Sequence, residues 1–419
     1  MKISKFYQIF LIAAFVCFLL SPQAEATFSI VAVDTITGEV GSAGASCIAG
    51  SNIIEDVVEG IGAINTQSFY LPGNQDNAHA LLIAGITPDS IMSWLEANDV
   101  QGDPSRRQYG AVTLAGQGAS AAFTGILCIE WKGHHTGPGY SIQGNILLGP
   151  EIIDSMKFVF LNTSGPFADR LMAALEAAKV IGADKRCAPE GKSSISAYIK
   201  VARIGDDGIP YLSEVVSNTI DSTDPIDLLR VKFDNWKLRQ KADADSSIVL
   251  NVPDAVRADG AATISITVVP FNLDGDTVRY TDSVVIVNSG GGTLSAVVNN
   301  GDKTFSATII SDTIAQTDTL TVFVESGGEL VQLSSRPVLS YYPCGDINFD
   351  LVASNILDLT YLVDFIFRGG PPPTIADAAD LDGSGGLSNI IDLTNLVDFI
   401  FRGGLKPTCG WYEDTLSPH

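Results

Sequence analysis

Thr27 is the residue of this sequence best suited to covalent chemistry, because of what precedes it. A basic start and an apolar run from Phe10 to Leu20 are followed by Ala24-Glu25-Ala26, which places small residues where signal peptidase reads them. Residues 1–26 are therefore predicted to be a secretory signal peptide. Cleavage would give Thr27 a free α-amine, with a reference pKa of about 7.7–8.0, beside its hydroxyl nucleophile. Nucleophile and base would then belong to one residue.

The segment after the predicted cleavage site, Thr27 to Val33, has the composition of a β-strand that would hold the amine and the hydroxyl at the end of a sheet. Every cleavage exposes some residue, so a non-catalytic Thr27 is the alternative. Cys17 lacks the small preceding residues of a lipoprotein signal, and no later segment is apolar and long enough to cross a membrane. We expect a secreted or extracytoplasmic protein.

A second set of oxygen-bearing residues recurs near the C-terminus at an offset of 34 residues. The matched pairs are Asp346 with Asp380, Asn348 with Asp382, Asp350 with Ser384 and Asp358 with Asp392. Each copy is followed by an amphipathic helix with apolar residues at i, i+3, i+4, i+7 and i+8. Calcium takes about six to eight oxygen ligands, and side chains at loop positions 1, 3 and 5 with a later carboxylate supply them in this order. An acidic, glycine-rich turn that binds no ion is the alternative.

Residues 344–410 resemble type I dockerins, duplicated calcium-binding modules that attach enzymes to cohesin partners. The resemblance implies two Ca²⁺ sites, with Asp346, Asn348, Asp350 and Asp358 as ligands in the first and Asp380, Asp382, Ser384 and Asp392 in the second. The closing aspartate falls at position 13, one later than usual, and Leu351 occupies the sixth position, where glycine normally permits the turn. The two similar helices imply pseudo-twofold symmetry, so that a partner could dock in either orientation, and the resemblance implies that this partner is cohesin-like. Docking onto the protein's own β-domain is the alternative.

The composition excludes several classes of function. The 419 residues carry 25 Lys+Arg against 48 Asp+Glu, which gives a formal net charge of −23, and 46% of them are hydrophobic. Such a chain is expected to fold into two to three domains. It has no basic cluster that could hold a phosphate backbone, so nucleic-acid binding is excluded and anionic membrane surfaces are disfavoured.

Changes of pattern along the chain predict a multidomain organisation. Short β segments and amphipathic helices mix from residue 27 to 242, which predicts one enzyme-sized domain. Residues 247–342 are rich in Val, Ile and Thr punctuated by Asp-Gly, Asn-Gly and Gly-Gly-Gly, which is typical of an all-β immunoglobulin-like sandwich. The repeat fills residues 343–410 as a small α module, and residues 411–419 form a tail.

Six short motifs punctuate the first domain. They are Thr27-Phe28-Ser29-Ile30-Val31-Ala32, Thr37-Gly38-Glu39-Val40-Gly41, Arg107-Gln108-Tyr109-Gly110, Phe123-Thr124-Gly125, Trp131-Lys132-Gly133-His134 and Gln143-Gly144-Asn145. These motifs resemble a bacterial family known as domain of unknown function 1028, which is assigned to the N-terminal nucleophile hydrolase superfamily. The resemblance spans Thr27 to about Trp236 and implies an α+β fold, a four-layer αββα sandwich, with Thr27 as nucleophile. In cytoplasmic relatives the same strand directly follows the initiator methionine, and signal peptidase would expose the threonine here.

An acyl-transfer site also needs donors for the oxyanion and groups that handle protons. Asn65 and Gln67, at the end of a predicted strand, and Asn145, after a glycine, carry amide groups that could donate. Arg107 could hold a substrate carboxylate through two hydrogen bonds, and His134 could transfer protons. The alternatives are a surface cation for Arg107, a hydrogen-bonding loop residue for His134, and turn residues for the two asparagines.

Five cysteines follow the predicted cleavage site, and disulfides persist outside the cytoplasm. Cys344 and Cys409 bracket the repeat and are expected to pair. The sequence does not choose a pairing among Cys47, Cys128 and Cys187.

Together these features predict a secreted N-terminal-threonine hydrolase that cleaves an amide or peptide bond and attaches to a partner through its calcium-binding module. Relatives of the first domain that are fused to peptidoglycan-binding modules imply cell-wall peptides as one substrate class. One alternative is a non-catalytic secreted binding or scaffold protein. Another is a component of a polysaccharide-degrading complex, although the paired carboxylates of a glycosidase cannot be located in the first domain.

Overall fold

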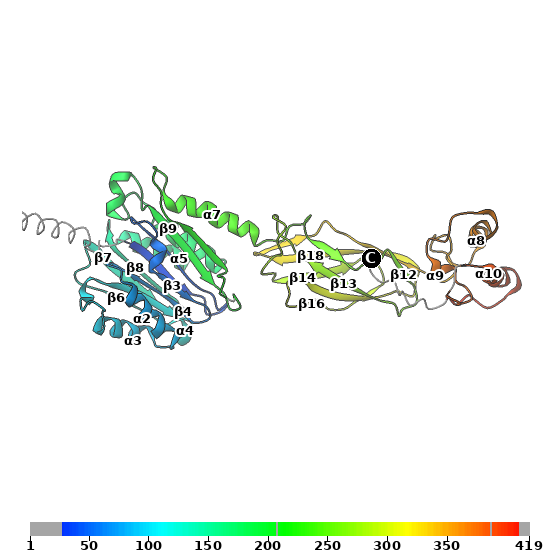
Figure 1. Ribbon diagram of the computed structural model, residues 1–419, viewed down its shortest axis with the longest axis horizontal. Helices are drawn as coiled ribbons and strands as arrows, with labels where there is room; N and C mark the ends of the chain where they lie inside the picture. The colour runs from blue at the N-terminus through cyan, green and yellow to red at the C-terminus, as the bar shows by residue number, and fades with distance from the viewer. Residues whose placement is uncertain (1–26, 207, 386–387, 410–419) are drawn as a thin grey trace, which may run out of the picture. The chain divides into compact units, whose positions relative to one another are not determined.

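The computed structural model describes residues 27–206, 208–385 and 388–409. Within it the chain forms two compact units (Figure 1). The N-terminal unit ends at Trp236 and the C-terminal unit begins at Lys237. The chain is therefore multidomain, as predicted.

Two predictions fall outside the described residues: the signal peptide at 1–26 and the tail at 411–419. Among the residues that are described, no helix combines the length and the apolar composition that crossing a membrane requires.

The N-terminal unit is built on two antiparallel sheets, one of six strands in the order β10-β9-β2-β1-β8-β7 and one of four in the order β3-β4-β5-β6. The strands of the first sheet are β1 (Thr27–Val33), β2 (Val40–Ser46), β7 (Trp131–Gly137), β8 (Tyr140–Leu147), β9 (Ser196–Ala202) and β10 (Leu212–Val216). Those of the second sheet are β3 (Glu55–Val58), β4 (Gly62–Gln67), β5 (Gln108–Thr113) and β6 (Ser120–Thr124). β1 lies at the centre of the first sheet, between β2 and β8.

Helices cover the outer face of each sheet, which gives this unit four layers in the order helix, sheet, sheet, helix (Figure 1). α2 (Pro72–Ile83) and α3 (Pro88–Ala97) pack on the four-stranded sheet. α5 (Glu151–Asn162), α6 (Phe167–Ala177) and α7 (Pro225–Arg239) pack on the six-stranded sheet. Shorter helical segments are η1 (Ser51–Ile54), η2 (Pro104–Arg106), α4 (Ala115–Gly118) and η3 (Lys185–Glu190).

Strand β1 shows how the sequence produces these layers. Successive residues of a strand face opposite sides of its sheet. Phe28, Ile30 and Ala32 belong to the apolar cluster formed with α5 and α6. Thr27 and Ser29, on the other face, make hydrogen bonds to the four-stranded sheet. One buried strand therefore has an apolar face toward the helices and a face that begins with polar residues toward the second sheet.

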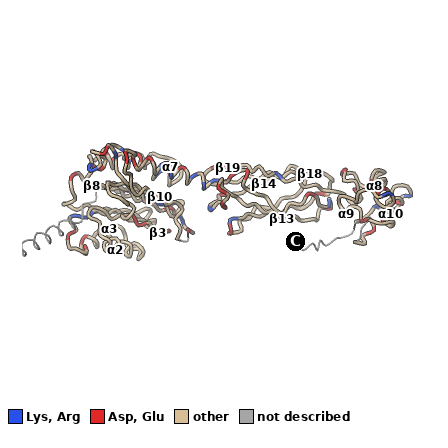
Figure 2. Tube along the Cα trace, turned by 45° about the horizontal axis from the view of Figure 1, so that its top comes forward, with Lys and Arg blue, Asp and Glu red and all other residues tan. Residues whose placement is uncertain are grey.

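Residues of both charge signs occur along α7 (Figure 2). Arg230 lies 3.5 Å from Glu176 and 3.2 Å from Asp234. Such partly exposed pairs contribute little to stability, about 0–1 kcal/mol each.

The C-terminal unit begins with two five-stranded sheets. One holds β11 (Ile248–Leu250), β13 (Thr263–Val269), β15 (Thr293–Leu294), β16 (Val298–Asn299) and β17 (Phe305–Ile310). The other holds β12 (Ala255–Arg257), β14 (Ser283–Asn288), β18 (Gln316–Ser326), β19 (Glu329–Gln332) and β20 (Val338–Tyr342). Alternate residues of both sheets, such as Ile266 and Leu339, share one buried cluster. The two sheets therefore pack face to face as a β-sandwich.

Three helices complete this unit: α8 (Ile356–Arg368), α9 (Ala376–Ala379) and α10 (Ile390–Arg402). α8 and α10 begin alike, because Asn355 and Asn389 each form a capping box with the aspartate three residues later. The buried leucines that join the two helices are Leu359, Leu362, Leu393 and Leu396.

Two disulfides are present among the described residues. Cys344 pairs with Cys409, which confirms the expected bond, and Cys47 pairs with Cys187, a choice that the sequence left open. Cys128 is buried and takes part in no disulfide.

Candidate functional site

Polar side chains line part of the space between the two sheets of the N-terminal unit, and an apolar cluster that includes Val31 and Val112 fills another part. These residues form the polar interlayer: Thr27, Ser29, Ser42, Ser46, Asn65, Gln67, Gln108, Ser141, Gln143, Asn145 and Tyr198. Each of them is at most 1% exposed. A buried polar group costs free energy unless it is hydrogen-bonded, so every member of this set requires a partner.

Thr27 lies at the end of β1, in a polar row that crosses the six-stranded sheet. Its direct neighbours are Ser46 of β2 and Asn145 of β8. Ser196 of β9 and Lys132 of β7 extend the row on either side. Directly opposed residues of antiparallel strands point to the same face of a sheet, so the whole row faces the polar interlayer.

Both the side chain and the backbone of Thr27 are hydrogen-bonded. Its hydroxyl Oγ1 donates to Ser46 Oγ at 3.3 Å, and its carbonyl oxygen accepts from Gln67 Nε2 of the other sheet at 3.2 Å. Gln67 Oε1 in turn accepts from Ser29 Oγ at 2.7 Å. The structure thus brings the predicted donor Gln67 to Thr27, where its amide fastens β1 to the second sheet.

Gln108 is the centre of this network. Its Oε1 accepts from Gln67 Nε2 at 2.8 Å and from Asn145 Nδ2 at 3.1 Å. Its Nε2 donates to the carbonyl oxygens of Gly144 at 2.9 Å and Gly133 at 3.1 Å. Because a carbonyl oxygen can only accept, these contacts fix which end of the Gln108 amide is nitrogen. They also require Asn145 to present its nitrogen to Gln108.

Asn145 Oδ1 is the exception in the network. It is buried, and it has no hydrogen-bond partner within the described part of the chain. Its orientation follows from that of Gln108, so rotating the amide would only exchange one unsatisfied contact for another. A buried amide oxygen without a donor costs about 1–3 kcal/mol. This acceptor lies in the same row as Thr27. It is therefore suited to accept a hydrogen bond from a bound ligand or from the α-amine that cleavage before Thr27 would create.

His134 of β7 joins the network at its rim. Thr124 Oγ1 accepts from Gln108 Nε2 at 3.0 Å and lies 2.8 Å from His134 Nδ1. Burial lowers the pKa of His134 below its ordinary value, and the neighbouring His135 adds to this effect. A mostly neutral imidazole near pH 7 can take up a proton. The structure therefore connects His134 to Thr27 through a chain of hydrogen-bonded side chains.

Asn65 belongs to a separate part of the polar interlayer. Its Oδ1 accepts from Ser42 Oγ at 2.9 Å, and its Nδ2 donates to Tyr198 OH at 3.2 Å. Burial raises the pKa of Tyr198, so its phenol stays protonated and can be shared in this cluster. The amide of Asn65 therefore holds the two sheets together, and nothing in its contacts supports the predicted role as an oxyanion donor.

The prediction that Arg107 binds a substrate carboxylate needs correction. Its side chain is only 3% exposed, and its Nε lies 2.8 Å from Asp99 Oδ2. Its remaining nitrogens donate to the carbonyl oxygen of Phe69 at 2.7 Å and to Gln101 Oε1 at 2.9 Å. Arg107 is neither a surface cation nor open to a substrate, because its guanidinium is a structural anchor for the loop that precedes β5.

Three residues near Thr27 were not among the predicted site residues: Gln108, Ser46 and Arg186. Gln108 lies inside one of the six motifs, and a polar glutamine at the start of a buried strand is a signal that could have identified it as a site residue. Ser46 and Arg186 are 140 residues apart, and Arg186 Nη2 lies 3.5 Å from Ser46 Oγ. Only the folded sheet and η3 bring them together, so no local pattern could have revealed this contact.

The second C-terminal loop gathers three carboxylates. Asp380, Asp382 and Asp392 each offer one oxygen, and these oxygens lie within 4.8 Å of one another, an arrangement that could hold a metal ion. Backbone N–H groups orient two of these aspartates: Ser384 N donates to Asp380 Oδ1 at 3.0 Å, and Leu381 N donates to Asp392 Oδ1 at 2.8 Å. Three of the four predicted ligands of this loop are thus brought together.

The first loop has the same backbone arrangement with different residues. Asp350 N donates to Asp346 Oδ1 at 2.9 Å, and Ile347 N donates to Asp358 Oδ1 at 2.7 Å, as at the matched positions of the second loop. Leu351 adopts the left-handed conformation, with φ 67°, that its counterpart Gly385 adopts with φ 72°. The leucine therefore does not prevent the turn. Asn348 and Asp350 point to one another through a 2.9 Å hydrogen bond.

Residues 27–229 match the model of DUF1028, a family of unknown function. The match begins at the residue that starts the central strand. It covers all four layers of the N-terminal unit, and residues 27–229 are the DUF1028 region below. None of the curated proteins is detectably similar to the chain.

Several solved structures resemble parts of the chain. A DUF1028 protein from Silicibacter pomeroyi is 25% identical with a TM-score of 0.42, over 50% of this chain and 88% of that chain. The Yersinia pseudotuberculosis adhesin InvE is 20% identical with a TM-score of 0.22, over 25% of this chain and 29% of that one. Invasin, a bacterial integrin-binding protein, is 11% identical with a TM-score of 0.23, over 57% and 37%. Likenesses at these TM-scores carry no conclusion about function.

Proposed function

We propose that the DUF1028 region is a secreted hydrolase that uses Thr27 as an N-terminal nucleophile against an amide or peptide bond. The observation that carries the proposal is the place of Thr27, at the end of the central strand beside the unpaired oxygen of Asn145. A free α-amine on Thr27 would be a donor of the kind that this oxygen lacks. The helix, sheet, sheet, helix layers also agree with the superfamily that the sequence motifs imply.

The chemistry assigned to these residues is acyl transfer. Thr27 Oγ1 attacks the carbonyl carbon, the α-amine of Thr27 takes the hydroxyl proton and passes it to the leaving amine, and water then hydrolyses the threonine ester. Asn145 Nδ2 has a second hydrogen besides the one that it donates to Gln108, and this hydrogen can stabilise the oxyanion. His134, at the rim, can exchange protons with solvent.

The test is to sequence the N-terminus of the secreted full-length protein and to treat it with a β-lactone, a hydroxyl-directed electrophile. A Thr27 start that carries a covalent adduct supports the proposal. Thr27→Ser should keep a slower reaction, Thr27→Ala should lose it, and the exposed Thr136→Ala should react like the wild type. A start elsewhere, or an unmodified Thr27, would instead favour a secreted binding or scaffold protein. Cell-wall peptides are the first substrates to screen.

For residues 343–410 we propose a dockerin-like module that binds two Ca²⁺ ions. The side chains that its loops present are carboxylates, an amide and a hydroxyl, which are the oxygen ligands that a hard cation takes. The three close carboxylates of the second loop support this assignment best.

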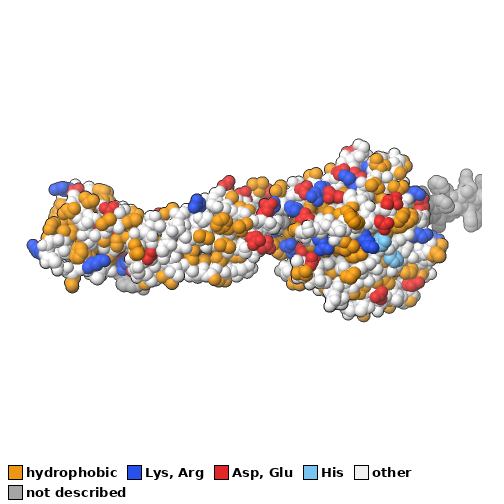
Figure 3. Space-filling view, turned by 180° about the vertical axis from the view of Figure 1, so that it is seen from behind, with side chains coloured by type: hydrophobic (Ala, Val, Ile, Leu, Met, Phe, Trp, Pro, Cys, Tyr) orange, Lys and Arg blue, Asp and Glu red, His pale blue; other side chains and the backbone are white. Residues whose placement is uncertain are grey.

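We further propose that this module docks to a cohesin-like partner. Apolar residues at matched positions of α8 and α10 are exposed in pairs, each residue at least 54% exposed: Ile356 with Ile390, Leu357 with Ile391 and Phe367 with Phe401. Figure 3 shows hydrophobic side chains on the surface of this end of the chain. Two equivalent apolar faces would allow a partner to bind in two orientations.

The docking proposal is tested by binding the full-length protein to an immobilised cohesin domain with calcium or with chelator. Phe367→Ser and Phe401→Ser should each leave binding through the other face, whereas the double variant should lose it. Ile314→Ser is the control, because Ile314 is as exposed as these residues but lies between β17 and β18. Binding that ignores both chelator and the double variant would refute the docking proposal.

A further inference from the structure

The positively charged side chain of Arg186 is separated from the Thr27 hydroxyl by a single side chain, that of Ser46. Arg186 belongs to η3, and Asp184, just before η3, pairs with Leu147 at the end of β8. Arg186 Nη2 is 3.5 Å from Ser46 Oγ, the atom that accepts the hydrogen of the Thr27 hydroxyl. The guanidinium of Arg186 and the hydroxyl of Thr27 therefore donate to the same acceptor, Ser46 Oγ.

Asp184 fixes the plane of this guanidinium. The Asp184 side chain is 0% exposed, and its oxygens accept from Arg186 Nε at 3.2 Å and from Arg186 Nη2 at 2.9 Å. The backbone N–H of Cys47 donates to the same carboxylate at 2.7 Å. Two hydrogen bonds from one guanidinium to one carboxylate set both its place and its orientation.

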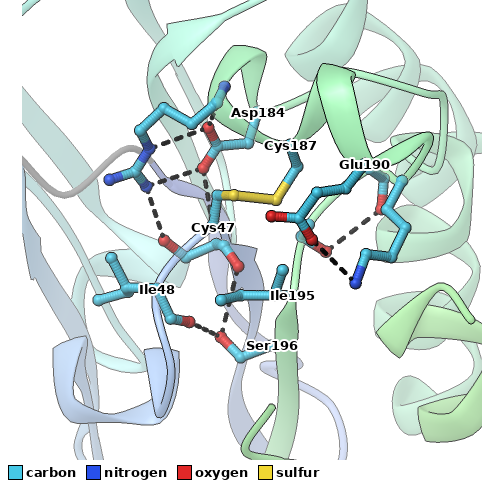
Figure 4. Close-up of a disulfide and its surroundings, with 12 residues drawn as sticks. Cys47, Ile48, Asp184, Cys187, Glu190, Ile195 and Ser196 are labelled. Carbon is cyan, nitrogen blue, oxygen red and sulfur yellow. Dashed lines mark hydrogen bonds and ion pairs between the residues drawn. A yellow bond between two sulfur atoms is a disulfide. The ribbon is translucent and has the colours of Figure 1, made fainter. Parts of the chain in front are cut away.

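A disulfide holds the two sides of this contact together. Cys47 directly follows Ser46, Cys187 directly follows Arg186, and the two cysteines are bonded (Figure 4). The cross-link thus joins the end of β2 to η3 at the point where both reach the Thr27 row. General stabilisation of the fold does not require it to be placed there, beside a charged group.

We propose that Arg186 is a positioning residue of the Thr27 site, which orients the Thr27 hydroxyl through Ser46 and whose charge favours the neutral form of the Thr27 α-amine. The inference rests on the proposed function, because it needs Thr27 to be the N-terminal residue. An amine acts as a base only when neutral, and a nearby positive charge disfavours the ammonium form.

The other groups that face the Thr27 row also influence whether this amine is neutral or protonated. Lys132 of β7, beyond Asn145, is a second cation, and Asp184 partly offsets the charge of Arg186. His134 contributes little charge near pH 7, because burial lowers its pKa. The uncharged residues that the other strands present are Ser46, Asn145, Gln67 and Gln108. Loss of Arg186 would remove a positive charge and would leave the negative charge of Asp184 without this partner. Both changes favour the ammonium form of the Thr27 α-amine.

The experiment measures the rate at which a β-lactone modifies Thr27 in the full-length secreted protein between pH 5.5 and 9. In Arg186→Gln the midpoint of the pH profile should move upward by roughly 0.5–1 pH unit. Arg186→Lys keeps the charge and should keep the midpoint. Lys185→Gln is the matched control, since Lys185 is the preceding residue and its ammonium pairs with the exposed Glu130.

A second variant covers the case in which Arg186→Gln fails to fold with Asp184 unpaired. Ser46→Ala keeps the ion pair and the disulfide but removes the atom that the hydroxyl and the guanidinium share. Its modification rate should fall about tenfold with an unchanged midpoint, because one orienting hydrogen bond is lost. A wild-type midpoint in Arg186→Gln, or a wild-type rate in Ser46→Ala, would overturn the inference while Thr27 stays reactive. A wild-type protein whose Thr27 is unreactive would overturn the proposed function itself.

Discussion

Buried aspartates occur in both units, and they differ in where their counter-charge comes from. Asp99 of the N-terminal unit has its cation in the chain, because Arg107 Nε lies 2.8 Å from it. Asp346, Asp358 and Asp392 of the C-terminal loops accept backbone N–H groups, but within the described residues none of them pairs with a lysine or an arginine.

The pKa values of these groups separate in the same way. Burial raises the pKa of Asp99, but hydrogen bonds from Arg107, Asn74 and two backbone N–H groups outweigh it and lower the pKa to about 2. Burial raises the pKa of Asp346, Asp358 and Asp392, and their hydrogen bonds do not reverse it. The N-terminal unit thus supplies the counter-charge of Asp99 from its own residues, whereas the counter-charge of the loop aspartates is what the proposed calcium ions would provide.

Removing the central partner of the polar interlayer should have the largest effect. In Gln108→Leu, the amides of Gln67 and Asn145 and the carbonyl oxygens of Gly133 and Gly144 all lose a partner. Each buried group left unpaired costs about 1–3 kcal/mol, so the free energy of unfolding of the N-terminal unit should fall by roughly 4 kcal/mol. Urea unfolding followed by tryptophan fluorescence measures this change.

A matched control for that variant is Thr136→Val, an exposed position on β7. It should stay within about 0.5 kcal/mol of the wild type. If Gln108→Leu also stayed within about 1 kcal/mol, the hydrogen bonds of Gln108 would not stabilise the polar interlayer in the way that its geometry indicates.

Counted per site, the second largest effect should come from calcium. At about 100 times its dissociation constant, an ion that binds only the folded form stabilises it by about 2.7 kcal/mol per site. Calorimetry of the full-length protein with calcium and with chelator should therefore show a C-terminal transition that moves, and an N-terminal transition that does not. A C-terminal midpoint indifferent to chelator would remove the metal from the proposal.

A reciprocal exchange sharpens the calcium prediction, because the two loops differ at their third position. Asp382→Asn gives the second loop the residue of the first, and Asn348→Asp does the reverse. The first change should reduce the calcium-dependent shift and the second should increase it, since each alters the number of carboxylates around the ion. Equal shifts in both variants would show that these positions do not contact the ion.

Several features of the two units could be predicted from the sequence. The strand from Thr27 to Val33 and the Cys344–Cys409 bond are present as predicted, because periodicity and the repeat are local signals. The predicted role of Arg107 in binding a substrate carboxylate is not supported, because its guanidinium is buried against Asp99, a partner across a loop that no local pattern identifies. Ser46 meets Thr27 through strand pairing that no spacing encodes.

Acid should break the ion pair that distinguishes Asp99. Its folded pKa of about 2 lies below the ordinary value near 3.9, so its contribution to stability is fully present above about pH 4 and is lost as pH falls through 2. The shift corresponds to about 2 kcal/mol. In urea unfolding, the difference between the wild type and Asp99→Asn should shrink between about pH 4 and 2. A difference that stays constant over that range would contradict the assigned pairing.

The smallest effect concerns backbone conformation in the first loop. Leu351 holds φ 67°, where side chains other than glycine cost about 1–2 kcal/mol, and Gly385 holds the same position of the second loop without that cost. Leu351→Gly should therefore stabilise the C-terminal unit by about 1 kcal/mol after the entropy lost by a more flexible unfolded chain is subtracted. The N–H that binds Asp346 Oδ2 is retained.

Val352→Gly separates relief of this strain from a general effect of glycine. Val352 is the next residue, it is exposed, and its φ is not positive, so glycine there brings only the entropic cost and should destabilise the unit by about 0.5–1 kcal/mol. Gly385→Leu should transfer the strain to the second loop and destabilise it. Opposite signs of the stability change at Leu351 and Val352, measured by calorimetry in chelator, would show that the two loops adopt the same backbone conformation. They would also show that this conformation is strained at the leucine of the first loop. Equal signs would mean that the leucine is not strained.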